Sequence, residues 1–118
     1  MKSDLDILPS DLKAESISPN EVVLDFNSTI RAISFFRDKK IALLGWEAWI
    51  QAQDGSLGHS KEFQGTVSLE RRSGETWQDY VKWTTDLCEK TIQEDFQKWN
   101  QKNEAKLKIF FCLSPILP

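Results

Sequence analysis

The sequence predicts a single α+β domain in which a small antiparallel sheet packs against two helices. An Asp54-Gly55 turn signal between two apolar runs is typical of a β-hairpin, placed at about residues 41–70. A capping threonine, Thr76, precedes apolar residues three and four apart, which predicts a long helix at about 76–101. The chain has 118 residues, 40% of them hydrophobic, and this suits one domain spanning residues 1–118.

The N-terminal part is predicted to be a lead-in followed by a helix. Residues 1–17 show weak periodicity and predict an irregular segment or a single strand. The segment SPNE at 18–21 has the spacing of a helix capping box with proline at the first helical position. Apolar residues at helical steps then predict a helix over 19–38: Val22, Val23, Phe26, Ile30, Ile33 and Phe36. Because Asn27 and Ser28 also favour helix caps, a turn followed by a helix from residue 28 is the alternative.

Residues 41–51 predict a central strand, because both of its faces are largely apolar. Strict alternation places Ala42, Leu44, Trp46, Ala48 and Ile50 on one face. It places Ile41, Leu43, Gly45, Glu47, Trp49 and Gln51 on the other. The second hairpin strand is expected at 63–70, with Phe63, Val67 and Leu69 inward and Gln64, Thr66, Ser68 and Glu70 outward.

The C-terminal part predicts the long helix and a final strand. The apolar stripe of the helix includes Trp77 and Trp99, which we expect to be structural, whereas Trp83 falls at its edge. Residues 107–113 alternate as a strand with apolar residues on both sides, and Pro115 follows it. We expect this strand to return beside residues 41–51 in the antiparallel sense.

Charge and cysteine content restrict the functional classes. The net charge is −3, and residues 1–30 carry two basic and six acidic side chains, a net of −4. This argues against nucleic-acid binding, which needs clustered basic residues, and it would suit a basic partner. No apolar run approaches the roughly 20 residues that a membrane helix needs, and no secretory signal pattern is seen. Cys88 and Cys112 lie in different predicted elements, so we expect two unpaired thiols in the cytoplasm.

The motifs of common catalytic and cofactor sites are missing from the sequence. The five glycines are scattered without the spacing of a phosphate-binding loop. One histidine and two separated cysteines do not make a zinc site. His59 and Ser60 are adjacent on an expected strand and would point to opposite faces. No catalytic, cofactor-binding or metal-binding residue is therefore predicted.

Glu47 is the most informative single residue, because a carboxylate amid an apolar strand needs a partner. It is interpreted as a general base with His59, as an anchor for a protein partner, or as a structural carboxylate pinned by a lysine, an amide or an indole. Trp49 shares its face, and exposed aromatic residues beside charges are typical of binding hot spots. The hypothetical partner-binding residues are Glu47, Trp49, Gln51, Asp54, His59 and Trp83. Asp54 is also explained by the turn alone.

The stretch NEVVLDFNSTIRAISFFRDKKIALLGWEAW, residues 20–49, resembles the Immunity protein 40 family of bacterial polymorphic-toxin systems. Family members show an N-E-x-A-L opening, a helix with an A-L-x-A-I-like pattern, and a strand ending in I-L-G before an acidic residue and aromatic residues. The matching positions are Asn20, Glu21, Leu24, Ala32, Ile33 and Ile41 to Gly45. Val23 stands where alanine is usual, and Trp46-Glu47 where glycine and aspartate are common.

The resemblance implies a protein that binds a cognate toxin domain and neutralises it by contact. Such a protein needs no cofactor and is not an enzyme. The competing hypothesis is a small enzyme or ligand-binding domain with a pocket around Glu47 and His59.

Overall fold

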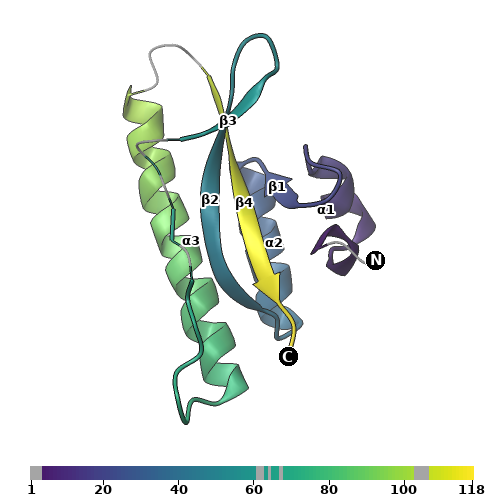
Figure 1. The fold of residues 1–118 in the computed structure, drawn as a ribbon, viewed down its shortest axis with the longest axis vertical. Helices are drawn as coiled ribbons and strands as arrows, with labels where there is room; N and C mark the ends of the chain where they lie inside the picture. Colours follow the sequence, from purple (N-terminus) through teal and green to yellow (C-terminus); the bar gives the residue numbers. More distant parts are fainter. Residues whose placement is uncertain (1–3, 61–62, 64, 67, 103–106) are drawn as a thin grey trace.

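The computed structural model of the protein describes residues 4–60, 63, 65–66, 68–102 and 107–118, and within them a four-stranded antiparallel sheet packs against helices. The strands, in the spatial order β1-β4-β2-β3, are β1 (Val22–Leu24), β4 (Lys108–Ile116), β2 (Ala42–Gln51) and β3 (Leu57–His59). The helices are the 3₁₀ helix η1 (Asp4–Ile7), α1 (Ser10–Glu15), α2 (Phe26–Asp38) and α3 (Trp77–Lys102). The predicted α+β class is confirmed (Figure 1).

The pairing of β2 with β4 forms the centre of the sheet. These strands run antiparallel, from Ala42 opposite Ile116 to Gln51 opposite Lys108. β1 adds to the far edge of β4, and α2 and α3 lie against the same face of the sheet (Figure 1). The predicted return of the last strand beside residues 41–51 is confirmed. The prediction that Pro115 ends this strand was wrong, because β4 continues through Pro115 to Ile116 opposite Ala42.

A β-bulge at Leu44 changes which side chains of β2 face the helices. Leu43 pairs with Pro115 and Gly45 with Ser114, so Leu44 is the extra residue. Beyond the bulge Trp46, Ala48 and Ile50 pack in the helix-facing core, and before it Leu43 and Ile41 do so instead of Leu44. Leu44 is 36% exposed. The prediction of strict alternation was therefore wrong at this end of the strand.

The predicted helix over 19–38 is shorter than expected, because its first part is β1. The Asp25 carboxylate accepts the backbone N–H of Ser28 at 2.8 Å and caps α2. Ser18 does not begin a helix. Its hydroxyl accepts the N–H groups of Asn20 and Glu21 at 3.3 and 3.2 Å, which turns the chain into β1. The alternative of a later helix start was closer to the structure.

The lead-in is helical instead of extended. Pro9 stands at the N-cap position of α1, where it starts a helix and does not interrupt one. Leu5, Leu8 and Leu12 are buried in the same core as α2. Their spacing brings the three leucines onto one side of two short helical segments, a pattern too brief to distinguish from noise in the sequence.

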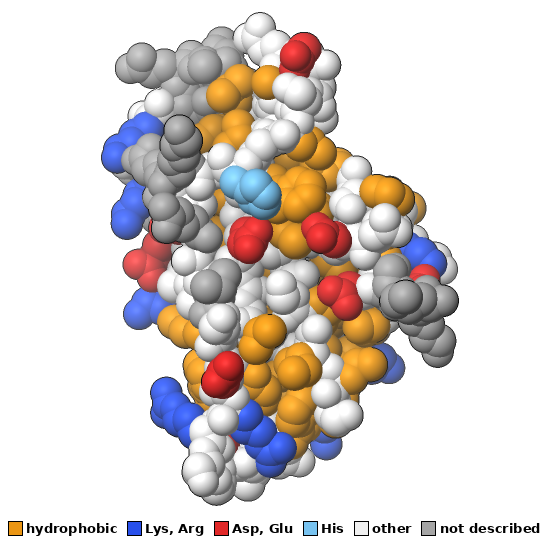
Figure 2. All heavy atoms as spheres, viewed as in Figure 1, with side chains coloured by type: hydrophobic (Ala, Val, Ile, Leu, Met, Phe, Trp, Pro, Cys, Tyr) orange, Lys and Arg blue, Asp and Glu red, His pale blue; other side chains and the backbone are white. Residues whose placement is uncertain are grey.

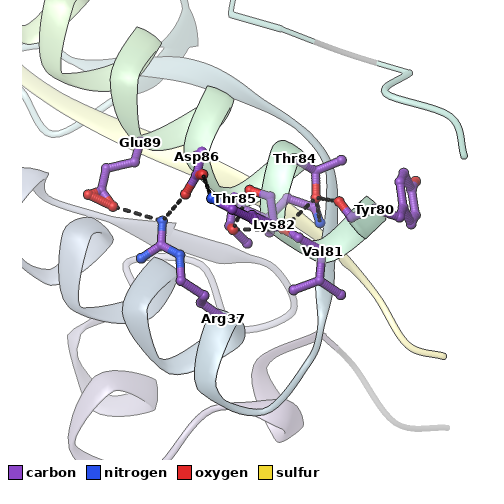
Figure 3. A network of polar contacts seen from close by, with 9 residues as sticks. Arg37, Tyr80, Val81, Lys82, Thr84, Thr85, Asp86 and Glu89 are labelled. Atoms are coloured by element: carbon purple, nitrogen blue, oxygen red, sulfur yellow. Dashed lines mark hydrogen bonds and ion pairs between the residues drawn. The ribbon is translucent and has the colours of Figure 1, made fainter. Parts of the chain in front are cut away.

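α3 agrees with the predicted helix within one residue. The hydroxyl of Thr76 accepts the N–H of Asp79 at 3.1 Å, as the capping pattern predicts. Polar contacts with α2 and β2 help to fix this helix in the fold (Figure 3). Arg37 of α2 bridges Asp86 and Glu89 at 3.1 and 3.0 Å, and the buried hydroxyl of Thr84 accepts the N–H of Leu43 at 3.1 Å.

The hairpin is real, but its second strand is short. The turn lies at Asp54-Gly55 as predicted, and β3 covers Leu57–His59. In the predicted strand 63–70, Thr66 exchanges backbone hydrogen bonds with Trp46 as an isolated bridge, so the described residues there form no regular strand. Phe63 is buried and Leu69 packs against the core, as expected. Gln64 and Val67 lie outside the described residues.

Two further predictions concern thiols and membranes. Cys88 and Cys112 are both free and buried, as expected. Within the described part of the chain, no helix has the length and apolar character to cross a membrane.

Candidate functional site

The face of the sheet turned away from α2 and α3 carries most of the predicted site residues. Cross-strand pairing sets them in two rows, because directly opposed residues share a face. His59, Trp49 and Phe110 form one row across β3, β2 and β4. Glu47, Cys112 and Val23 form the next row across β2, β4 and β1. These six residues are called the Glu47 face below.

The Glu47 face is covered at one side and open at the other. Val23, Phe110 and Cys112 are buried, with Ile17 and Trp49 packed against them. Glu47 and His59 are open to solvent, with side chains 47% and 71% exposed. Figure 2 shows this side of the molecule, where acidic and hydrophobic side chains gather beside the histidine. The covered side comes from the loop before β1, where the N–H of Ile17 donates to the carbonyl of Val23 at 3.0 Å.

Glu47 and His59 form the pair that the sequence placed across the hairpin. Nδ1 of His59 lies 3.6 Å from Oε2 of Glu47. The imidazole also packs edge-on against Trp49, with ring centroids 5.5 Å apart. Because both polar groups are solvent-exposed, water screens their attraction, and the pair contributes little to stability. The Glu47 carboxylate is thus available to a partner at little cost.

Carboxylates from distant parts of the chain surround Cys112. Oε2 of Glu21 lies 3.7 Å from the Cys112 sulfur. Burial raises the pKa of the Cys112 thiol to about 12, and the charges of Glu21, Glu47 and Asp4 act in the same direction. Burial, followed by the charge of Glu21, raises the pKa of Asp4. Asp4, Glu21 and Glu47 therefore make this side of the molecule electronegative, which favours a positively charged partner.

Trp49 is packed on one side and unsatisfied at its polar end. Its indole N–H is covered by neighbouring atoms and meets no hydrogen-bond acceptor among the described residues. A buried donor without an acceptor costs about 1–3 kcal/mol. Trp49, which lies beside the exposed Glu47–His59 pair, therefore carries an unsatisfied donor in the free protein.

Two hollows are each lined in part by a residue of the Glu47 face. One, of about 190 Å³, is lined by Leu44, Gly45, Glu47, Ser68 and Ser114. The other, of about 530 Å³, lies where α2 begins and β4 starts, and its aromatic lining comes from Phe26, Phe96, Trp99 and Phe110. Neither of these two linings contains both Glu47 and His59, the pair around which the enzyme hypothesis places its pocket.

Two further predicted site residues belong to the end of the hairpin: Gln51 follows Trp49 on the same side of β2, and Asp54 lies in the turn beyond it. Asp54 accepts hydrogen bonds from the N–H and hydroxyl of Ser56 at 2.9 and 2.6 Å, which explains it by the turn and lowers its pKa. The Gln51 amide donates to the carbonyl of Gly55 at 3.4 Å within the same hairpin.

Trp83 belongs to a different part of the molecule. It packs with Tyr80 and Val81 near Ala42, under the guanidinium of Arg72 at 4.9 Å. Ala42 is seven positions along β2 from Trp49, roughly 23 Å at the usual rise of a strand. Trp83 is therefore not part of the Glu47 face.

Four residues in or beside the Glu47 face were not predicted as site residues from the sequence. Asp4 and Glu21 come from the N-terminal segment, and Phe110 and Cys112 from the last strand. The acidic excess of residues 1–30 was a signal, but it did not indicate where those charges lie. Across the described ranges, no group of three or more His, Cys, Asp or Glu side chains is arranged to hold a metal ion.

Comparison with models of known protein families, with curated proteins and with solved structures found no match for this chain.

Proposed function

We propose that this protein binds a basic protein partner through the Glu47 face and neutralises it by contact. The observation that carries the proposal is the partly exposed aromatic ring of Trp49, which packs on the buried Phe110 and lies beside the exposed carboxylate of Glu47. Aromatic side chains supply buried area in interfaces, and a charged group at the edge supplies direction. The aromatic ring of Trp49 and the carboxylate of Glu47 lie on the same face of the sheet.

The charges of this region favour a basic partner over an acidic or neutral one. Glu47, Glu21 and Asp4 all act on Cys112, so their fields overlap there. Complementary charge speeds the encounter of two proteins and rejects partners of the same sign. A surface rich in lysine or arginine would meet these carboxylates and cover Trp49.

A bacterial toxin domain is the partner that the sequence resemblance favours. The residues that carry the resemblance include Glu21 beside Cys112, Leu24 of β1, and the strand up to Gly45. They run through the elements that build the Glu47 face. An inhibitor of this type works by covering its target, so binding alone is the activity.

The competing hypothesis, an enzyme using Glu47 and His59, has less support from the geometry. General acid–base catalysis works best where water is excluded and the groups are held firmly. Here both side chains are substantially exposed, and their contact is 3.6 Å long. Loss of turnover in Glu47→Gln with unchanged partner binding would favour the enzyme hypothesis instead.

A growth experiment tests the proposed function. The domain encoded at the C-terminal end of the adjacent open reading frame is the candidate partner, and it is expressed in bacteria with and without this chain. We expect the domain to arrest growth and the wild-type chain to restore it. Glu47→Lys should lose protection, because it reverses the charge presented to a basic partner. The matched control is Glu94→Lys on the exposed side of α3, which should protect fully. A domain that is harmless, or equal protection by both variants, contradicts the proposal.

A further inference from the structure

We infer that the hollow beside Glu47 receives an arginine side chain of the partner. This inference rests on the proposed function and names the chemical group that one part of the Glu47 face recognises. The hollow, called the Gly45 notch below, has a volume of about 190 Å³ and is lined by Leu44, Gly45, Glu47, Ser68 and Ser114. That volume is below the roughly 300 Å³ at which small-molecule pockets begin, and it suits one inserted side chain.

The shape of the Gly45 notch follows from the bulge in β2. Gly45 lies opposite Ser114 on β4, and neither residue carries a bulky side chain at this point of the sheet. The bulge turns Leu44 outward, so that it forms an apolar wall in place of a core contact. Bulges commonly redirect a side chain beside a functional site. A side chain that enters here passes Leu44 and ends near Glu47.

The segment after β3 forms the opposite wall. The N–H of Leu69 donates to the carbonyl of Leu44 at 2.8 Å, which fixes the segment beside the bulge. Ser68 has a φ of 59°, a left-handed conformation that is uncommon for serine. Non-glycine residues in such conformations cluster at active sites and ligand clamps. In this structure the left-handed residue is Ser68, which lines the Gly45 notch and carries a hydroxyl group.

The chemistry of the lining fits arginine better than other side chains. Glu47 brings a half-exposed carboxylate, and Ser68 and Ser114 bring hydroxyl oxygens that accept hydrogen bonds. A guanidinium has five N–H donors in a planar fork, which match a carboxylate and neighbouring acceptors together. Its aliphatic stem would pack on Leu44. Lysine offers a point charge with three donors, and an acidic side chain would be repelled by Glu47.

The test is an NMR titration of the ¹⁵N-labelled protein with the amide of N-acetylarginine. We expect saturable shifts of the Gly45 and Ser114 amides, with a dissociation constant in the millimolar range. The uncharged isostere N-acetylcitrulline amide and the lysine analogue should bind at least about tenfold more weakly, as expected when a charge-assisted, bidentate contact is lost. Glu47→Gln should weaken arginine binding by a similar factor, and the control Glu94→Gln should not.

A second variant tests the shape of the Gly45 notch. Ser114→Leu should fill it and abolish the shifts, provided that the spectrum shows a folded protein. If Ser114→Leu does not fold, Glu47→Gln alone decides. The inference is overturned by an absence of shifts at the Gly45 notch, by equal binding of the citrulline or lysine analogue, or by unchanged binding to Glu47→Gln. The titration contains no partner protein, so these results leave the proposed function standing. Loss of neutralisation with intact arginine binding would count against that function alone.

Discussion

At the scale of single residues, the reactivity of the Cys112 thiol measures the negative charge around the Glu47 face. Burial raises the pKa of its thiol to about 12, and Glu21 is the strongest of the neighbouring charges. Because the thiolate is the reactive form, we expect iodoacetamide to alkylate Cys112 slowly at about pH 8. Glu21→Gln removes the negative charge beside the sulfur, 3.7 Å from it, and leaves a weaker, uncharged acceptor, so alkylation should become several-fold faster.

Cys88 provides the internal control for this measurement. Burial alone raises the pKa of its thiol to about 12, without a neighbouring charge. Mass spectrometry of the alkylated protein should show two free thiols without reduction and a rate at Cys88 that Glu21→Gln leaves unchanged. If Cys112 reacts as fast as free cysteine, or both rates change together, the acidic surroundings assigned to Cys112 are incorrect.

Asp4 and Asp11 give opposite predictions for the pH dependence of stability. Burial and Glu21 raise the pKa of Asp4, so its folded-state stabilisation exists at low pH and is lost as pH rises through that pKa. Asp4→Asn should therefore raise the melting temperature at about pH 7. A hydrogen bond from Arg31 lowers the pKa of Asp11, so Asp11→Asn should lower the melting temperature there. Thermal melts at about pH 7 and pH 3 check this, and both differences should shrink at the lower pH. Shifts of the same sign in both variants would refute the assignment.

At the scale of elements, Gly65 controls how the segment after β3 docks on β2. Its φ is +84°, and a Cβ there would lie 2.0 Å from the carbonyl oxygen of Trp46. That oxygen accepts the N–H of Thr66 at 3.0 Å, so no room can be made without losing the bridge. Gly65→Ala should therefore destabilise the protein by about 2 kcal/mol or more, the sum of a left-handed alanine and a broken contact.

Gly74 is the matched control for Gly65. Its φ is +79°, but an added Cβ would meet nothing within 4 Å. Gly74→Ala should cost only the conformational part, about 1 kcal/mol. Urea denaturation of both variants measures the two free energies of unfolding. Equal losses would mean that the approach of this segment to β2 is not constrained by Gly65.

The cap of α2 explains why the sequence misplaced the start of this helix. Val22 to Leu24 continue the apolar spacing of α2 backwards, so periodicity alone extends the helix through β1. The structure ends that extension at Asp25, whose carboxylate holds the N–H of Ser28. Asp25→Ala should lower the free energy of unfolding by about 1 kcal/mol, and Asp25→Asn, which keeps an acceptor, by much less. Urea denaturation distinguishes them, and equal stability of the two variants would contradict the capping role.

At the scale of the whole molecule, local patterns predicted the elements and missed the arrangement of the site. The Asp54-Gly55 turn, the Thr76 cap and the alternation of the last strand each act over a few residues, and each was predicted correctly. The bulge at Leu44 escaped prediction, although a glycine within a strand often marks one. The sheet and its covering loop bring Glu21 beside Cys112 across 91 positions, a contact that no local pattern encodes.

The tertiary structure also divides the predicted binding residues into separate groups. Glu47, Trp49 and His59 share one face, as alternation along the strand and the hairpin predicted. Trp83 lies near the other end of β2, and Asp54 serves its turn. A contact surface therefore cannot include Trp49 and Trp83 unless it spans much of a molecule 46 Å long.

The central claim is that the Glu47 face is the surface that binds the partner, and the affinity of two tryptophan variants tests it most directly. Isothermal titration calorimetry would measure binding of the candidate partner domain from the growth experiment to Trp49→Ala and to Trp83→Ala, with folding verified by circular dichroism. Truncating an aromatic anchor commonly costs about 2 kcal/mol, so Trp49→Ala should bind roughly thirtyfold more weakly. Trp83→Ala should bind like the wild type. Near-wild-type affinity of folded Trp49→Ala, or a loss confined to Trp83→Ala, would contradict the claim.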